Sequence, residues 1–142
     1  MPHIASRNVE FFEHFGDGRL PQHMGLRITH VSEALLRAEF TIAPHHFAPN
    51  GYLHAASVIA LADTAAGYAC FAHLPEGATT FTTIELKCNF VGTTKEGVVS
   101  CEARGVHLGN TTQLWDVEVR REGSDKPIAL FRCTQMVLWP KK

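Results

Sequence analysis

The stretch His54-Ala-Ala-Ser-Val-Ile-Ala-Leu-Ala-Asp-Thr-Ala-Ala-Gly-Tyr-Ala-Cys-Phe-Ala72 decides the fold of this chain. Apolar residues recur along it at helical spacing, and the opposite side carries only small or apolar residues around Asp63. A helix that is apolar all round is buried on all sides. We therefore expect a long helix with a sheet against one face and a further partner, such as a second subunit, against the other.

Asp63 is the only formally charged side chain in that helix. A lone carboxylate among apolar neighbours is costly to bury unless something compensates for it. Burial would raise its pKa, whereas helix dipoles and hydrogen bonds would lower it. Asp63 is therefore the first candidate for chemistry. The alternative is a structural carboxylate bonded to a nearby hydroxyl, such as that of Thr64.

Strand patterns lie on both sides of the helix. They fall at residues 25–33 and 34–42 before it, and at 83–90, 99–104, 115–120 and 129–134 after it. Alternation of apolar and polar residues argues for an antiparallel sheet with one buried face. At 83–90 the alternation groups Thr83 with the polar residues. With a short helix at 8–15, the order predicts an α+β fold in a single domain over residues 1–142.

The bulk properties narrow the classes of function. The chain of 142 residues has a formal net charge of -1, which gives no electrostatic case for nucleic acid or an anionic membrane as partner. We find no apolar run of the length needed to span a bilayer, and the N-terminus lacks the apolar core of a signal peptide. We therefore expect a cytoplasmic protein. The cysteines, expected to be reduced core thiols, are Cys70, Cys88, Cys101 and Cys133.

Two motifs give this pattern a family likeness. Asn50-Gly-Tyr-Leu-His-Ala-Ala56 and Leu61-Ala-Asp-Thr-Ala65 stand in the order and spacing of a His-Gly-Gly … Leu-Ala-Asp-Thr-Ala motif. The chain thereby resembles the hotdog-fold acyl-CoA thioesterases of the phenylacetate-degradation (PaaI-like) and 4-hydroxybenzoyl-CoA thioesterase type. Segments 84–90, 106–119 and 129–135 add to the likeness, which covers residues 23–139. It implies a hotdog fold, in which an antiparallel sheet wraps around one long central helix.

The resemblance also implies roles for residues of the helix and of the strand after it. The helix carboxylate, here Asp63, is the nucleophile or general base. The first backbone N–H after the motif histidine, here that of Ala55, binds the thioester oxygen. Ala55 and Ala56 replace the two glycines of the family motif, and the Ala55 N–H can still serve if its φ is negative. Thr83 matches a hydroxyl that positions water opposite the carboxylate, although a threonine is also common in any strand.

Other polar residues before the helix carry less distinct implications. Asn50 matches an amide that touches the thioester in the family, and a turn or cap role is equally open. His54 borders the site or stabilises the start of the helix. A metal site built on His45, His46 and His54 is disfavoured, because no Asp, Glu or Cys stands at ligand spacing beside them.

The turn around Gly109, Asn110 and Thr111 is the candidate for the nucleotide end of coenzyme A. Glycine permits close backbone approach, and Asn and Thr offer donors to phosphate. Family members often carry Arg where Asn110 stands, so phosphate binding would fall to Arg104, His107 or a lysine of a partner chain. An ordinary hairpin turn is the alternative.

We expect, in sum, an acyl-CoA thioesterase for a small aryl or medium-chain substrate that needs no metal or external cofactor. Ala55 and Asp63 are about 12 Å apart along one helix. One carbonyl cannot touch both, so the active unit is expected to be a homodimer within a homotetramer. The alternatives are a catalytically weak acyl-CoA binding module, made plausible by Ala55 and Ala56, and a hotdog dehydratase acting on 3-hydroxyacyl thioesters.

Overall fold

The computed structural model describes residues 3–142. Its helical segments are α1 (Val9–Glu13), α2 (Leu20–His23), the short 3-10 helix η1 (Pro44–His46) and α3 (Ala55–Ala72). Its strands are β1 (Arg27–Ser32), β2 (Leu35–Thr41), β3 (Thr80–Phe90), β4 (Val98–Leu108), β5 (Thr112–Arg121) and β6 (Pro127–Leu138). The predicted order of two strands, one long helix and four strands is confirmed.

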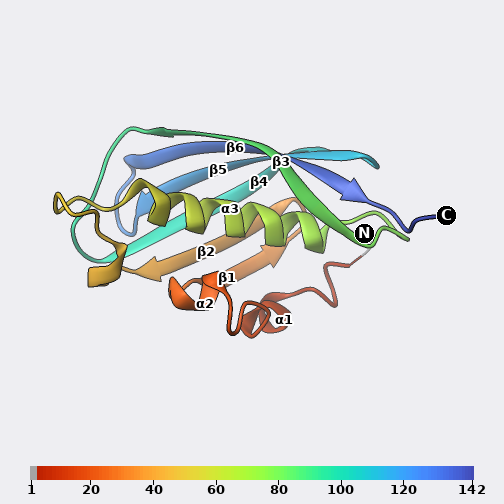
Figure 1. The fold of residues 1–142 in the computed structure, drawn as a ribbon, viewed down its shortest axis with the longest axis horizontal. Coiled ribbons are helices and arrows are strands. Elements are labelled where there is room, and N and C mark those ends of the chain that lie inside the picture. Colours follow the sequence, from red (N-terminus) through yellow and green to blue (C-terminus); the bar gives the residue numbers. More distant parts are fainter. Residues whose placement is uncertain (1–2) are drawn as a thin grey trace.

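The described residues form one six-stranded sheet, with α3 lying across one face of it (Figure 1). The strand order is β1-β2-β4-β5-β6-β3, and every neighbouring pair is antiparallel. α3 contacts the five strands from β2 to β6. This is the α+β hotdog arrangement that the sequence likeness implied, with a short N-terminal helix ahead of the sheet.

The core lies between α3 and the inner face of the sheet. Alternate strand residues point into it, as the sequence pattern predicted, and these include Leu36, Ala38, Phe40, Val99, Cys101, Ala103, Trp115, Val117, Val119, Ala129, Phe131 and Cys133. Burial of this apolar surface is the main favourable contribution to folding, at roughly 25 cal/mol per Å² removed from water. All four cysteines are free, and only Cys88 is less than fully buried.

The length of α3 corrects the expectation that no apolar run is long enough to span a membrane. It has 18 residues and a mean hydropathy of 1.4, so by length and composition it could cross a membrane. The core helix of a globular domain passes the same test when its residues are buried in the protein. Here Val58, Leu61 and Ala65 pack into the core against the sheet, so the apolar length of α3 is accounted for by the fold.

A bulge in β3 corrects the predicted direction of Thr83. The pairing of β3 with β6 shifts register between Thr83 and Glu85. Before the shift Thr83 lies opposite the inward-facing Gln135, and after it Leu86 lies opposite the inward-facing Cys133. Alternation through 83–90 had placed Thr83 among the outward polar residues. The extra residue of the bulge turns it to the inner face instead.

β3 forms one edge of the sheet, and its apolar residues stay partly open to solvent. Ile84 is 53% exposed and Leu86 is 40% exposed, although both belong to the apolar pattern of the strand. β3 has eleven residues and pairs on one side only, with β6, within the described chain. A long apolar edge of this kind is a template for pairing with another strand.

The N-terminal segment differs from the expectation in extent. α1 spans Val9–Glu13 rather than residues 8–15, and it is capped by the side chain of Asn8, which accepts a hydrogen bond from the Phe11 N–H at 3.0 Å. α2, which contains only four residues, was not predicted. Phe12 stacks on Tyr68 of α3 with ring centroids 4.7 Å apart, so the segment packs against the second half of α3.

Candidate active site

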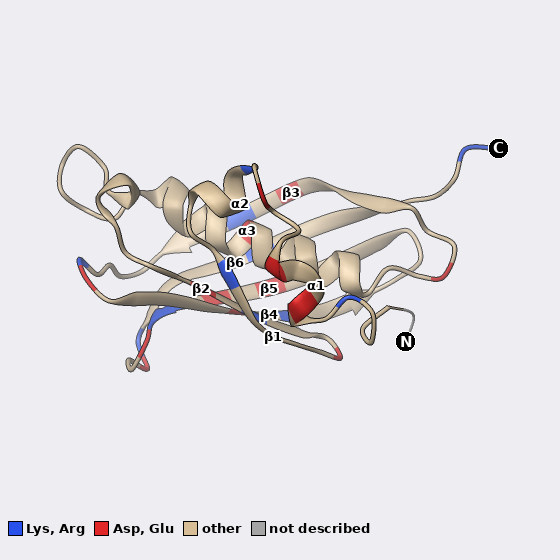
Figure 2. Ribbon diagram, turned by 90° about the horizontal axis from the view of Figure 1, so that it is seen from below, with Lys and Arg blue, Asp and Glu red and all other residues tan. Residues whose placement is uncertain are grey.

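Asp63 lies at the middle of α3, the helix that Figure 2 shows almost free of charge, with the other charges on the strands, loops and α1. The residue is partly buried, and its Oδ1 atom is buried with no hydrogen-bond partner in the described chain. Burial raises the pKa of this carboxyl above its ordinary value. A buried carboxylate oxygen without a partner is costly, and such exceptions mark groups with a use outside the fold.

The start of α3 presents one free amide. His54 is the N-cap, and its Nδ1 atom accepts a hydrogen bond from the Ala56 N–H at 2.9 Å. The Ser57 N–H donates to the His54 carbonyl oxygen at 2.9 Å. Among the described residues, no acceptor is found for the Ala55 N–H, which comes before these two amides in the chain. This amide stands at the positive end of the helix dipole, where developing negative charge is stabilised.

Alanine in place of glycine does not disturb this amide. The one non-glycine residue with positive φ in the described chain is Ala34, so Ala55 has the negative φ that its role requires. Ala55 and Ala56 are both exposed, and their methyl groups border the start of the helix. The negative φ that an Ala55 donor requires is therefore present.

The structure does not bring Ala55 and Asp63 together within one chain. Both lie on the regular helix α3, eight residues apart, which is about 12 Å of helical rise. Thr83, by contrast, comes from β3 and faces the helix. Its Oγ1 atom donates to Gln135 Oε1 at 2.7 Å.

Gln135 is a residue that the sequence analysis did not single out. It is fully buried on β6, at an inward position that Ala129, Phe131, Cys133 and Val137 fill with apolar side chains. Gln135 could have been found from the sequence, because it is a large polar residue at a position where the alternating pattern of the strand calls for an apolar one. His46 was likewise passed over except as a metal ligand. It is buried, and its carbonyl oxygen accepts from Ser57 Oγ at 2.8 Å, which ties η1 to the start of α3.

Asn50 and His54 are both engaged with backbone in this chain. Asn50 Oδ1 accepts from the Tyr52 N–H at 3.2 Å, in a turn where Gly51 has a φ of 85°. His54 acts as the helix cap described above. Within residues 3–142, no group of three or more His, Cys, Asp or Glu side chains is placed so that it could hold a metal ion.

The turn proposed for the nucleotide lies beside the last turn of α3, far from Ala55. Gln113, which follows it on β5, donates through Nε2 to the carbonyl oxygen of His73 at 2.9 Å. Asn110 and Thr111 are exposed, and the carbonyl oxygen of Asn110 accepts from Trp139 Nε1 at 2.9 Å. A Cβ atom at Gly109 would lie 2.9 Å from the Thr112 carbonyl oxygen, so glycine is required there by close approach.

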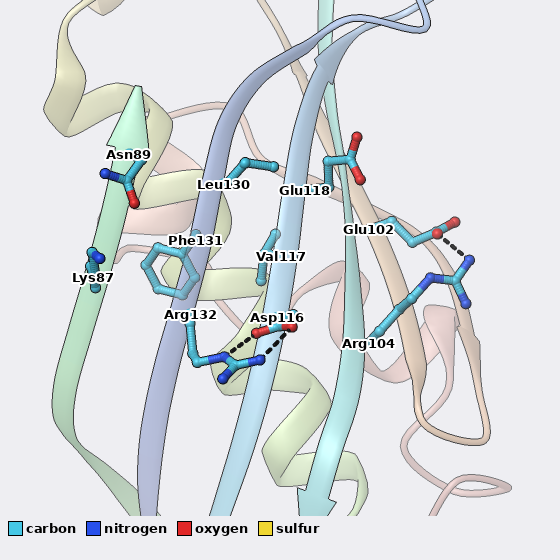
Figure 3. A pocket seen from close by; sticks show the side chains of 10 residues that line it. All are labelled: Lys87, Asn89, Glu102, Arg104, Asp116, Val117, Glu118, Leu130, Phe131 and Arg132. Carbon is cyan, nitrogen blue, oxygen red and sulfur yellow. Dashed lines mark hydrogen bonds and ion pairs between the residues drawn. The ribbon is translucent and has the colours of Figure 1, made fainter. Parts of the chain in front are cut away.

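A wide groove lies on the outer face of the sheet, and none of its lining residues is Asp63. It has a volume of about 610 Å³ and is lined by charged residues of β3 to β6 together with Asn89, Val117, Leu130 and Phe131 (Figure 3). Arg132 binds Asp116 through two hydrogen bonds, of 2.5 and 2.9 Å, and Arg104 pairs with Glu102. Arg104, a candidate for phosphate binding, therefore already has a carboxylate partner on this face.

Comparisons with known proteins agree with this geometry. The sequence pattern of the family described as "Thioesterase superfamily" matches residues 50–128, which include His54, Ala55, Asp63 and Thr83. The chain is 28% identical over 125 residues to the 1,4-dihydroxy-2-naphthoyl-CoA hydrolase of Listeria monocytogenes, covering 87% of this chain and 98% of that protein.

Solved structures share the fold. A mutant of thioesterase PA1618 from Pseudomonas aeruginosa matches with a TM-score of 0.86 and 24% identity, over 92% of this chain and 93% of that one. The E. coli PaaI protein from the phenylacetic acid degradation operon matches with a TM-score of 0.74 and 23% identity, over 83% of each chain. The family match spans more than half of the sequence. The chain belongs to the thioesterase superfamily and is a hotdog-fold thioester hydrolase.

Proposed function

We propose that this chain is an acyl-CoA thioesterase that hydrolyses a small aryl or medium-chain acyl-CoA to the free acid and CoA. Family membership supports the reaction, and the relative from Listeria, whose name specifies an aryl-CoA, supports the substrate class. The single observation that carries the proposal is the buried Asp63 Oδ1, which has no hydrogen-bond partner in the described chain.

Asp63 would act as nucleophile or general base. In the general-base course, its carboxylate takes a proton from water, and the water oxygen forms a bond to the thioester carbon. The carbonyl oxygen then carries negative charge, which the Ala55 N–H stabilises at the start of α3. Breaking the C–S bond releases the CoA thiolate, which receives the proton from Asp63. Water and a carboxylate suffice for this reaction, so we propose no metal or external cofactor.

The active unit would be a homodimer. Ala55 and Asp63 are too far apart on one helix to contact the same carbonyl, so the Ala55 amide of one subunit would face Asp63 of the other. The partly exposed apolar edge of β3 supports such pairing, because two β3 strands could continue one sheet through both subunits. The full assembly would be a homotetramer of two such dimers, in the cytoplasm.

The substrate would extend from the site shared by Ala55 and Asp63 toward the β4–β5 turn. Backbone and side-chain donors of Gly109, Asn110 and Thr111 would hold the phosphates of CoA, and Arg104 would contribute charge if it exchanged its carboxylate partner for phosphate. Ala56 would border the acyl group, and Asn50 and His54 would line the approach to the thioester.

A panel of acyl-CoA substrates tests the proposal. Release of CoA would be followed with a chromogenic thiol trap, for aryl and medium-chain substrates, with wild type, Asp63→Asn and the control Asp125→Asn. Asp125 is an exposed carboxylate in the β5–β6 loop. We expect thiol release from wild type and the control, and a loss of about 10²–10⁴-fold in the Asp63 variant. Equal turnover by wild type and Asp63→Asn would refute the proposal.

The same panel separates the alternatives. A binding module would retain acyl-CoA without releasing thiol. A dehydratase would convert a 3-hydroxyacyl-CoA to an enoyl-CoA, again without thiol. The use of His54 Nδ1 as the cap of α3 weighs against the dehydratase: Nδ1 accepts from the Ala56 N–H, so the proton of the neutral ring lies on Nε2 and neither nitrogen is free to act as a base.

A further inference from the structure

The hydroxyl of Thr83 reaches the inner face of the sheet only because of the bulge in β3. The register shift between Thr83 and Glu85 sets Thr83 directly opposite Gln135. β-Bulges commonly re-aim a side chain beside an active site. The bulge therefore gives Thr83 a direction that regular alternation would deny it.

Thr83 faces the turn of α3 that carries Asp63. Gly67 and Phe81 are in close approach, since a Cβ atom at Gly67 would lie 3.0 Å from Phe81 Cζ. β3 runs back along α3 in the opposite direction (Figure 1). From that contact, Thr83 lies two residues further along the strand, about 6.6 Å. Asp63 lies four residues earlier on the helix, about 6 Å in the same direction.

The residue beyond Thr83 is Gln135, whose amide is held in one orientation. Its Nε2 atom lies 3.4 Å from Cys133 Sγ and donates to it, which leaves Oε1 to accept from Thr83 Oγ1 at 2.7 Å. Cys133 in turn is close enough to Asp63 for the carboxylate to help raise the pKa of the Cys133 thiol to about 12, after the larger effect of burial. Thr83, Gln135 and Cys133 thus form a linked group beside the Asp63 turn.

The hydrogen bond to Gln135 fixes what Thr83 can do. A threonine hydroxyl has one proton and two acceptor lone pairs, whereas an amide oxygen can only accept. The Thr83 proton is therefore committed to Gln135 Oε1, and Thr83 Oγ1 is left as an acceptor. A water molecule between Thr83 and Asp63 could then direct one O–H to each, with its lone pair turned toward a third atom.

We propose that Gln135 is a positioning residue for thioester hydrolysis: by accepting the only proton of Thr83, it makes Thr83 Oγ1 the acceptor that orients the water activated by Asp63. This rests on the proposed function. The water gives one proton to Asp63, keeps the other in its hydrogen bond to Thr83, and forms the C–O bond, which puts negative charge on the carbonyl oxygen; re-forming the C=O bond then breaks the C–S bond. The proton held by Asp63 passes to the departing sulfur.

A double-mutant cycle tests the inference. The variants are Thr83→Val, Gln135→Met and the double variant, with Thr83→Ser as the conservative replacement. Thr82→Val is the matched control, because Thr82 is an exposed threonine next in the same strand. We expect kcat to fall about 10–100-fold in each single variant with KM unchanged, because water is misplaced while acyl-CoA still binds. The double variant should be no slower than Thr83→Val, and Thr83→Ser should retain most of the activity.

Gln135 is buried, so folding is checked in parallel by thermal unfolding. Gln135→Asn provides a second variant, which keeps an amide in the core but is one methylene too short to reach Thr83, and the same loss of kcat is expected. Wild-type kcat in a folded Gln135 variant, or single losses that multiply in the double variant, would overturn the inference alone. Wild type that releases no thiol from any acyl-CoA in the panel would overturn the proposed function and the inference with it.

Discussion

Asp63 combines a chemical use with a cost to stability. Burial raises the pKa of its carboxyl, so folding favours the protonated form over the ionised one. A group whose pKa is raised on folding binds protons more readily in the native state, and the stability it contributes therefore falls as pH rises. The ionised carboxylate that hydrolysis would need is therefore held in the folded chain at a cost in stability.

Asp63→Asn is predicted to raise thermal stability while removing hydrolysis. The amide has the shape of the carboxyl but no charge to desolvate. We expect the melting temperature at pH 7.5 to rise by a few degrees, on the order of the shift that 1 kcal/mol produces in a chain of this size. Differential scanning calorimetry at pH 7.5 measures it. A lower melting temperature than wild type would mean that the ionised carboxylate stabilises the fold.

At the residue scale, features that depend on residue type within an element could be predicted from the sequence, whereas side-chain directions that depend on strand register could not. Asp63 stood out because no other charge lies in its helix, and the structure leaves its buried Oδ1 without a partner in the described chain. The direction of Thr83 could not be predicted, since a bulge changes the count between strands and leaves no mark in a two-residue period. Gln135 was visible only as a polar exception to an apolar pattern, and its meaning depends on the strand opposite.

At the element scale, α3 is fixed at both ends by buried histidines. His46 accepts from the Ala43 N–H through Nδ1 at 2.9 Å and donates through Nε2 to the Met24 carbonyl oxygen at 2.8 Å. His73, which follows the helix, accepts from the Ala34 N–H through Nε2 at 2.8 Å and donates through Nδ1 to the Ala69 carbonyl oxygen at 2.7 Å. Each ring is therefore held as one neutral tautomer.

Acid is predicted to loosen this fixation. Burial lowers the pKa of His46, and the neighbouring His45 and His23 lower it further. The unfolded chain therefore binds the proton near pH 6.5 while the folded chain does not, so the free energy of unfolding falls as pH drops through 6.5. Each unit by which folding lowers the pKa is worth about 1.4 kcal/mol. Urea unfolding at pH 7.5 and 5.5 should show a larger loss for wild type than for His46→Gln; equal losses would contradict the prediction.

Ala55→Pro is predicted to remove the oxyanion donor without disturbing α3. Proline is tolerated at the first position of a helix, where its missing N–H breaks no intrahelical bond, and His54 has the extended backbone that proline requires before it. We expect kcat to fall about 10²–10³-fold. Circular dichroism should show the helix retained. Ala55→Gly, which changes the same residue but keeps its N–H, is the control, and full activity of the proline variant would exclude the Ala55 amide as donor.

The elements that carry strong periodic patterns were predicted well, and the short ones were not. α3 begins at Ala55 and ends at Ala72, within a residue of the sequence interpretation, because its apolar pattern runs through five turns. α2 has only four residues around Pro21, too few to show any period. The exposure of Ile84 and Leu86 was likewise out of reach, since strand order in the sheet, rather than alternation, decides which strand is an edge.

At the scale of the whole molecule, the edge of β3 is predicted to hold two subunits together. Leu86→Lys places a charge on that edge, and charged edges oppose strand pairing. We expect the variant to be monomeric by light scattering coupled to size exclusion, with hydrolysis lost in proportion. Leu20→Lys, at a 60% exposed leucine on α2, is the control. A dimeric Leu86→Lys protein with normal turnover would exclude β3 as the interface.

A mixture of two inactive variants is predicted to recover activity. Asp63→Asn keeps the amide and Ala55→Pro keeps the carboxylate, so a dimer with one chain of each kind contains one intact site. Random pairing after co-expression makes about half of the dimers mixed, which restores about a quarter of wild-type activity. Thiol release by the co-expressed pair, compared with each variant alone, measures this. A mixture no more active than its components would mean that each site lies within one chain.

The two edges of the sheet differ in a way that bears on how far assembly can proceed. β1, the opposite edge, has six residues, a register shift between Ile28 and His30, and α1 packed beside it. Short, irregular and covered strands make poor templates for further strands. When β3 of one chain pairs with β3 of another, both edges that favour pairing are occupied, and only the two β1 edges remain unpaired. Assembly by strand addition would then stop at two chains. An apolar edge that could otherwise support an open-ended polymer would instead give a closed assembly.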